Sequence, residues 1–193
     1  MNIIQIENLT KKYGKKIIFE NINILINSKN IYFLISENGT GKTTFFKTLL
    51  KETKYLGTII DAEIKYVYLP EKVVLPSYVT AFNFVKSFLE LDKRFIQEEV
   101  ELYFEELEIT KYKDVFMQNL SKGTKQKVLL IKTLLSNGDA YLFDEPLSGL
   151  DLKSRIKVIN LFEKLFLKGK IVIIATHYFE EYNYKFKEVV NLK

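Results

Sequence analysis

The stretch from Ile31 to Thr44, which reads IYFLISENGTGKTT, decides the fold of this chain. Its first five residues are apolar and predict a strand that is buried on both faces. A polar turn with two glycines follows, and residues 45–51 have a helical pattern. This order of strand, glycine-bearing turn and helix is typical of a phosphate loop, in which backbone N–H groups and the positive end of the helix point at polyphosphate oxygens.

The turn matches G-x-x-x-x-G-K-[ST] except at its first position, where Ser36 replaces glycine. We expect Lys42 to reach the β and γ phosphates and the Thr43 hydroxyl to ligate magnesium. The residues expected around the phosphates are Ser36, Glu37, Asn38, Gly39, Thr40, Gly41, Lys42, Thr43 and Thr44. A plain strand-to-helix turn built on Asn38-Gly39 is the alternative, and the strand before Gly41-Lys42-Thr43 favours phosphate binding over it.

Length and composition indicate an ordinary globular chain. The 193 residues, 47% of them hydrophobic and 27% charged, predict one domain with a single core. The net charge of +5 comes from scattered lysines, so no nucleic-acid partner is expected. The absence of cysteine suits a reducing cytoplasm, and residues 1–7 show no secretory signal. Apolar runs such as Ile171 to Ala175 are far below the ~20 residues that span a bilayer.

The remaining elements predict an α/β fold around the loop. Residues 1–30 alternate as in an antiparallel meander with a turn at Tyr13-Gly14. The other expected elements are one or two strands in 57–69, two amphipathic helices in 77–108, helices at 121–135 and 152–168, and strands at 140–143, 171–175 and 189–190. This alternation predicts one domain, 1–193, with a mostly parallel sheet, an antiparallel β part and an inserted helical part at about 77–136.

Two carboxylates follow the apolar strand at 140–143. Asp144 and Glu145 should lie at its carboxyl end, beside the phosphate loop. There Asp144 could hold magnesium through water, while Glu145 polarises the water that attacks the γ phosphate. An apolar strand that ends in Asp-Glu is weak evidence alone and also fits a solvated turn. Together with Gly41-Lys42-Thr43 it indicates nucleotide chemistry.

A further motif carries a family resemblance. Residues 119–126, which read NLSKGTKQ, closely resemble the L-S-x-G-x-x-Q signature of ABC-type ATPases. The motifs of that family occur here in the family's order and cover essentially the whole chain: Tyr13, 36–44, 121–126, Asp144-Glu145-Pro146, 148–151 and His177. The chain therefore resembles an ABC transporter ATP-binding subunit, which implies a P-loop NTPase fold of the ABC-ATPase type that uses ATP and Mg²⁺.

The resemblance also implies roles that the residues alone do not give. Tyr13 would stack on adenine, although a lone tyrosine also fits simple turn packing. His177, the single histidine, would contact the γ phosphate, although such a residue is more often structural. Ser121 would cap a helix in either reading. The resemblance implies that a second subunit's nucleotide is contacted by Ser121, Lys122, Gly123 and Gln126, and that residues 148–151 cross the dimer interface.

Three departures from the family pattern stand out. Ser36 lacks the freedom of glycine, so the loop adopts a conformation that serine tolerates or carries strain of about 1 kcal/mol. Glu71, after Pro70, stands where the family has a glutamine. It can still reach magnesium, but it adds negative charge beside a triphosphate. The chain is also short for the family and shows no regulatory extension after His177.

The resemblance implies an ATPase that powers transport through a separate integral-membrane permease. It implies a head-to-tail dimer, expected to be a homodimer, that is cytoplasmic and peripheral on the inner face of the cell membrane. The permease would dock in a groove between Glu71 and about Leu91. The signature form and the sequence around Pro70 resemble exporters of peptides, drugs or lipids. The alternatives are a soluble ABC-type ATPase and a weakly hydrolysing ATP-binding regulatory module, and the sequence leaves the cargo undefined.

Overall fold

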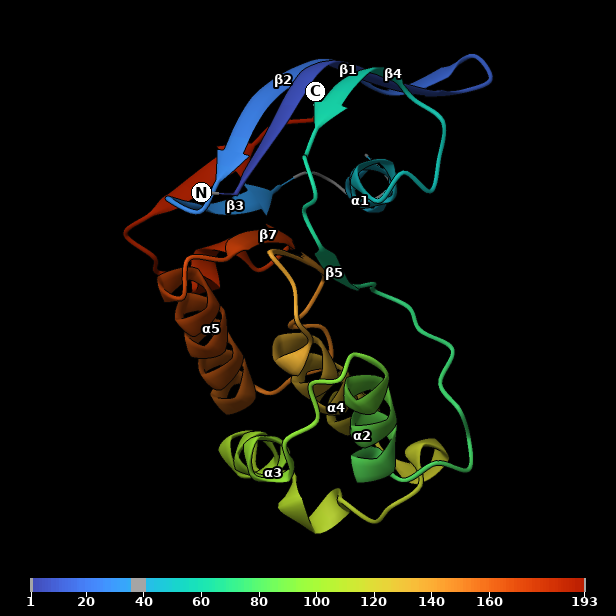
Figure 1. The fold of residues 1–193 in the computed structure, drawn as a ribbon, viewed down its shortest axis with the longest axis vertical. Helices are drawn as coiled ribbons and strands as arrows, with labels where there is room; N and C mark the ends of the chain where they lie inside the picture. The colour runs from blue at the N-terminus through green and yellow to red at the C-terminus, as the bar shows by residue number, and fades with distance from the viewer. Residues whose placement is uncertain (1, 36–40, 193) are drawn as a thin grey trace.

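The computed structural model describes residues 2–35 and 41–192, and this part of the chain contains two β-sheets, with most of the helices on the far side of the central sheet from the antiparallel one (Figure 1). The central sheet has five parallel strands in the order β5-β6-β7-β3-β8. A separate sheet has three antiparallel strands in the order β2-β1-β4. The predicted combination of a parallel sheet, an antiparallel part and a helical part is confirmed.

The central sheet is built from short apolar strands. They are β3 (Ile31–Leu34), β5 (Tyr66–Leu69), β6 (Ala140–Asp144), β7 (Ile171–Ala175) and β8 (Lys187–Val190). Every residue of β3, β6 and β7 is buried, which explains why their sequences show apolar runs and no alternation. The edge strand expected at 189–190 is β8. Because β7 lies between β3 and β6, the phosphate-loop strand and the Asp144 strand are not direct neighbours.

The antiparallel sheet contains β1 (Ile3–Tyr13), β2 (Lys16–Asn27) and β4 (Leu56–Ile60). The hairpin after Tyr13 is where the sequence predicts it. One face of this sheet is apolar and packs inward, and its buried residues include Ile4, Ile6, Leu9, Phe19, Ile22 and Ile26. Strand β4 pairs with β1, so the strands expected in 57–69 belong to different sheets.

The described part of the chain has five α-helices: α1 (Lys42–Leu49), α2 (Ala81–Leu91), α3 (Gln97–Glu106), α4 (Lys122–Leu135) and α5 (Leu152–Leu167). Helix α1 lies between the antiparallel sheet and the central sheet, whereas α2, α3 and α4 lie on the opposite side (Figure 1). Alternate residues of β3 enter the two cores, with Phe33 on the side of α2–α5 and Tyr32 on the side of α1. Single-domain organisation with an inserted segment at 77–136 stays a prediction.

Substitution of Gly57 tests the β1–β4 pairing. Its φ is +96°, and a Cβ there would lie 2.4 Å from the Asn8 carbonyl oxygen. We expect Gly57→Ala to lower the free energy of unfolding by about 2–4 kcal/mol, because the strand has to shift and the left-handed conformation is strained. Urea denaturation measures this loss.

Gly14 provides the matched control for that substitution. It has a φ of +56°, and a Cβ there would meet nothing within 4 Å. Gly14→Ala should therefore cost only the conformational strain of about 1–2 kcal/mol. Equal losses in the two variants would contradict the close approach of Gly57 to β1.

Candidate functional site

A cavity of about 340 Å³ lies where β5, β6 and β7 end and α1 begins. Ligand sites of open α/β sheets form at the carboxyl ends of the strands, because side chains from several strands meet there. The cavity is lined by Gly41, Lys42, Thr43, Thr44, Glu71, Asp144, Glu145, Ser148, His177 and Tyr178. The structure thus brings together residues that are up to 137 positions apart in the chain (41 to 178).

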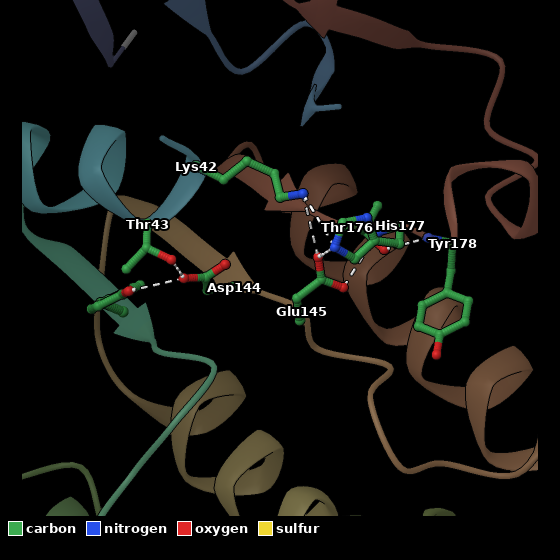
Figure 2. Close-up of polar contacts among 8 residues, drawn as sticks. Lys42, Thr43, Asp144, Glu145, Thr176, His177 and Tyr178 are labelled. Atoms are coloured by element: carbon green, nitrogen blue, oxygen red, sulfur yellow. Dashed lines mark hydrogen bonds and ion pairs between the residues drawn. The ribbon is translucent and has the colours of Figure 1, made fainter. Parts of the chain in front are cut away.

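Thr43 and Asp144 are in direct contact, as Figure 2 shows. The Thr43 hydroxyl donates to Asp144 Oδ2 at 2.6 Å. Thr43 comes from the first turn of α1 and Asp144 from the last residue of β6, and the Tyr68 hydroxyl adds a longer contact of 3.4 Å to the same oxygen. A hydroxyl and a carboxylate at this point are hard oxygen donors of the kind that Mg²⁺ prefers.

Glu145 directly follows β6 and is held in the sheet by its backbone. Its N–H donates to the Ala175 carbonyl oxygen at 2.9 Å, which extends the pairing with β7 by one residue. Its φ is +50°, in the left-handed region that non-glycine residues rarely adopt. Such strained residues are often found at functional sites, where the surrounding structure holds them. Here the conformation places a carboxylate in the cavity.

His177 contacts both Lys42 and Glu145, which lie 3.8 Å from each other (Figure 2). Its Nε2 atom is 3.3 Å from Lys42 Nζ and 3.1 Å from Glu145 Oε1. A neutral Nε2 can accept from the lysine or donate to the carboxylate, but one tautomer cannot do both. The His177 backbone N–H donates to the other oxygen of Glu145 at 3.3 Å. The three side chains therefore form one polar cluster whose proton positions are coupled.

Burial controls the charges of this cluster. It raises the pKa of the Glu145 carboxyl, against the opposing effects of His177 and Lys42. It also raises the pKa of Asp144, although the hydrogen bond from Thr43 opposes this shift. Burial lowers the pKa of Lys42, although Glu145 and Asp144 favour its charged form. Both carboxylates and the lysine are thus less well solvated than in water, and additional charged ligands would interact strongly with them.

The donor set fits a magnesium–nucleotide pair better than a bare metal ion. Within the described residues, no group of three or more His, Cys, Asp or Glu side chains is arranged to hold a metal. Mg²⁺ in nucleotide sites typically uses one or two carboxylates together with phosphate oxygens. Thr43, Asp144, Glu71 and Lys42 all line the cavity, so the three oxygen-bearing side chains could hold the ion while Lys42 binds the phosphates.

The remaining predicted residues lie elsewhere or cannot be placed. Ser36, Glu37, Asn38, Gly39 and Thr40 fall outside the described residues. Tyr13 is 51% exposed at the end of β1 and does not line the cavity as the described residues define it. Hydrogen bonds to Thr53 and, more weakly, to Thr44 lower its pKa, so its hydroxyl lies next to a cavity residue.

The residues of the signature lie apart from the cavity. Ser121 caps α4, and its hydroxyl accepts from the Thr124 N–H at 3.1 Å. Ser121 and Lys122 are exposed, while Gln126 Nε2 donates to the Pro146 carbonyl at 3.0 Å. Gly123 packs so closely on the loop after β6 that a Cβ would lie 2.6 Å from the Gly149 oxygen. Within one chain, therefore, Ser121, Lys122, Gly123 and Gln126 are not among the described residues that line the cavity, although Lys122 Nζ donates to the hydroxyl of Ser148, which does line it, at 3.3 Å.

Tyr178 was not a sequence-predicted site residue, although it lines the cavity. Its position directly after His177 was the available signal. Ser148 also lines the cavity, whereas the sequence motif suggested an interface role for residues 148–151. Both residues follow strand ends, where loop paths rather than local patterns decide which side chains point inward.

Comparisons with known proteins agree with this geometry. Residues 19–148 match the family model described as ABC transporter. A protein of Methanocaldococcus jannaschii named an uncharacterized ABC transporter ATP-binding protein is 32% identical over 92% of this chain and 69% of its own length. A zinc import ATP-binding protein of Rickettsia bellii is 32% identical over 89% of this chain and 74% of its own.

A solved structure shares the architecture. It is a protein from Pyrococcus furiosus whose name assigns it to the ABC transporters as an ATP-binding protein. The TM-score is 0.85 at 28% identity, and the match covers 98% of this chain and 97% of that one.

Proposed function

The chain belongs to the ABC transporter family and is an ATPase that uses ATP with Mg²⁺, and from this premise we propose that it powers transport through a separate membrane permease. The observation that carries the proposal is the cavity in which Lys42, Thr43, Asp144, Glu145 and His177 meet. The composition of this cavity matches a magnesium-bound triphosphate and an attacking water.

The contacts support a proposed role for each of these side chains. Lys42, at the start of α1, holds the β and γ phosphates, and the N–H groups of the first turn support it. Bound Mg²⁺ would neutralise phosphate charge, with Thr43, Asp144 and Glu71 as its protein ligands. Glu145 polarises the attacking water, for which its burial-raised pKa makes it a better base. His177 contacts the γ phosphate and orients Glu145 through its backbone N–H.

The position of the signature supports a proposal of dimerisation. The start of α4 has no acidic residue in its first turn, and Ser121 and Lys122 are exposed there. The positive end of a 14-residue helix is therefore open to an anion, although Ser121 and Lys122 are not among the described residues that line the chain's own cavity. We propose that two copies associate head to tail, so that Ser121, Lys122, Gly123 and Gln126 of each copy cover the γ phosphate bound by the other.

The permease would bind the segment between β5 and α2. Val74 is 99% exposed and Tyr78 is 80% exposed, which is unusual for two large apolar side chains in one short segment. Leu75 and Phe82 pack against the core, so they support the segment and do not form its surface. No helix in residues 2–35 and 41–192 is both long and apolar enough to cross a membrane. We propose a peripheral position on the inner face of the cell membrane.

The relatives do not support the direction of transport that the sequence suggests. Export of a peptide, drug or lipid has no support among them, since those whose names state a direction, such as zinc import and phosphonates import proteins, are import proteins. We therefore propose uptake as the direction, with the cargo determined by the permease. Recovery of the chain from membranes with a polytopic partner, and loss of that recovery in Val74→Asp with Tyr78→Asp, would support the docking segment. Unchanged recovery would contradict it.

Phosphate release from Mg-ATP by the purified chain tests the proposed chemistry. We expect turnover that needs both ATP and Mg²⁺ and that is faster at protein concentrations at which the dimer forms. Retention of nucleotide without phosphate release would instead indicate an ATP-binding regulatory module. Failure to retain nucleotide at any Mg²⁺ concentration would contradict the assignment of the cavity.

Glu71 gives a prediction specific to this chain. Burial and, to a smaller extent, the negative charge of Glu71 raise the pKa of Asp144, and both carboxylates line the cavity, so we propose that they bind one cation together. With Glu71→Gln, we expect the Mg²⁺ concentration for half-maximal hydrolysis to rise about threefold to tenfold, because one formal charge at the cation site is lost. Glu105→Gln, at an exposed position on α3, is the control. A lower Mg²⁺ requirement in Glu71→Gln would show that Glu71 repels the triphosphate and does not serve the metal.

A further inference from the structure

We infer that Arg155, on α5, is a positioning residue that holds the loop after β6 and the loop after β7 in one fixed arrangement. None of the sequence motifs includes it. The inference rests on the proposed function, because these two loops carry Ser148, His177 and Tyr178 into the cavity. Arg155 itself is not among the residues that line the cavity, so it acts through others.

Arg155 makes three contacts in three directions. Its Nε–H donates to the Leu150 carbonyl oxygen at 3.0 Å, in the loop after β6. Its Nη1 donates to Glu181 Oε1 at 2.5 Å, in the loop after β7. Its guanidinium carbon lies 4.1 Å from the centroid of the Tyr178 ring. Only a planar guanidinium can combine a forked donor set with stacking on an aromatic ring, so lysine is not an equivalent replacement.

On one side, Arg155 is connected to α4, the helix that Ser121 of the signature caps. The loop that contains Leu150 also contains Pro146, Ser148 and Gly149. The Pro146 carbonyl oxygen accepts from Gln126 Nε2 at 3.0 Å, and the Ser148 hydroxyl accepts from Lys122 Nζ at 3.3 Å. Gly149 is the residue that Gly123 approaches closely. The first turns of α4 and the loop after β6 are therefore packed as one unit, and Arg155 holds the end of this unit.

On the other side, Arg155 is connected to the catalytic cluster. Tyr178, over which the guanidinium lies, donates its backbone N–H to Thr176 Oγ1 at 2.9 Å. The preceding residue, His177, donates its backbone N–H to Glu145 Oε2 at 3.3 Å (Figure 2). Displacement of Tyr178 would thus move His177 relative to Glu145. Arg155 completes a continuous series of contacts from α4 to the reacting carboxylate.

The Arg155–Glu181 pair is partly buried, and for this reason its loss should disturb the loop. The two side chains are 20% and 28% exposed, and in the described part of the chain the second carboxylate oxygen of Glu181 has no hydrogen-bond partner. Loss of the arginine would leave a partly buried carboxylate without compensation, and the loop would rearrange to solvate it. Lys164, which is on the same helix as Arg155, pairs with Glu106 of α3 at a similar distance of 2.7 Å, but the Lys164 side chain is 55% exposed and contacts neither loop. Such exposed pairs contribute little.

The test compares Arg155→Lys and Glu181→Gln with the wild type and with Lys164→Gln as the matched control. We measure kcat and KM for ATP, the dissociation constant of the nucleotide and the thermal midpoint. We expect kcat to fall roughly tenfold in both variants, because a 1 Å misplacement of reacting groups can lower the rate by up to about a hundredfold. The KM for ATP and the nucleotide affinity should stay within about twofold of the wild-type values. The double variant should be no slower than the slower single variant, since each change breaks the same pair.

Several results would overturn the inference. One such result is a wild-type kcat in both Arg155→Lys and Glu181→Gln. A second is an equal fall of kcat in Lys164→Gln, and a third is a double variant whose loss of kcat is the product of the two single losses. A parallel fall of affinity, kcat and thermal midpoint would indicate a merely structural role. Hydrogen exchange gives a readout that does not depend on hydrolysis: in Arg155→Lys, amides of 147–150 and 177–182 should exchange faster together. If the wild type does not hydrolyse ATP, the proposed function fails, and unchanged exchange in these two loops would separately refute the role of Arg155.

Discussion

Glu145→Gln is expected to lower kcat for ATP hydrolysis by roughly a thousandfold, within the range of 10²–10⁴ that general-base catalysis supplies. Glutamine keeps the shape of the side chain and can still accept the His177 N–H, but it cannot take a proton from water. Nucleotide affinity should change less than about threefold, because Lys42 and Thr43 remain in place. Single-turnover phosphate release and equilibrium binding of Mg-ATP measure the two effects.

The stability of the same variant separates chemistry from folding. Burial raises the pKa of Glu145 in the folded chain above its value in the unfolded chain. Ionisation of Glu145 therefore opposes folding at neutral pH, and this cost disappears as the pH falls below the pKa of the unfolded state. Glu145→Gln removes the cost, so its thermal midpoint at pH 7 should equal or exceed that of the wild type. Glu163→Gln, exposed on α5, is the control, and equal hydrolysis by wild type and Glu145→Gln would refute the role of Glu145.

Lys42→Met is expected to weaken Mg-ATP binding by at least about a hundredfold, because a desolvated cation next to phosphate contributes several kcal/mol. Methionine retains the apolar stem that fills the start of α1, where Lys42 is only 8% exposed. Binding of a fluorescent ATP analogue, followed by competition with ATP, measures the loss. Lys168→Met at the exposed end of α5 should bind as the wild type does.

Removal of Lys42 should also change the titration of the cavity. Lys42 lowers the pKa of both Glu145 and Asp144, opposing the effect of burial. Without it, both carboxyl groups should retain their protons to higher pH, so any residual hydrolysis should rise with pH over a range shifted upward from that of the wild type. A pH–rate profile identical in shape to the wild-type profile would show that the lysine does not couple to the carboxylates.

The parts of the site that could be predicted are those with a local pattern. The phosphate loop combines a strand, a turn and a helix within 14 residues, and Asp144-Glu145 directly follows an apolar strand. The rule that parallel strands share a carboxyl edge was enough to bring them together, and the 2.6 Å contact from Thr43 to Asp144 confirms it. The start of α1 at Lys42 was missed, since Lys42 to Thr44 have no apolar period.

Strand order and loop paths could not be predicted in the same way. The placement of β7 between β3 and β6 depends on the pairing of β3 with β7, whose partner residues are more than a hundred positions apart, and a single sequence carries no signal for such a pairing. Likewise, β4 has the pattern of a strand but nothing local that assigns it to β1 and not to the central sheet. The contacts of Arg155 connect three separate segments, namely α5, the loop after β6 and the loop after β7. No sequence motif at its position in α5 indicated them.

The left-handed backbone of Glu145 has a consequence for protein engineering. At a φ of +50° a glutamate carries strain of order 1 kcal/mol, which asparagine or glycine tolerates better. Directed evolution that selects this chain for heat resistance alone should therefore accumulate Glu145→Asn or Glu145→Gly. The selected variants would gain thermostability and lose ATP hydrolysis. A thermostability screen of this chain therefore has to be combined with an activity screen.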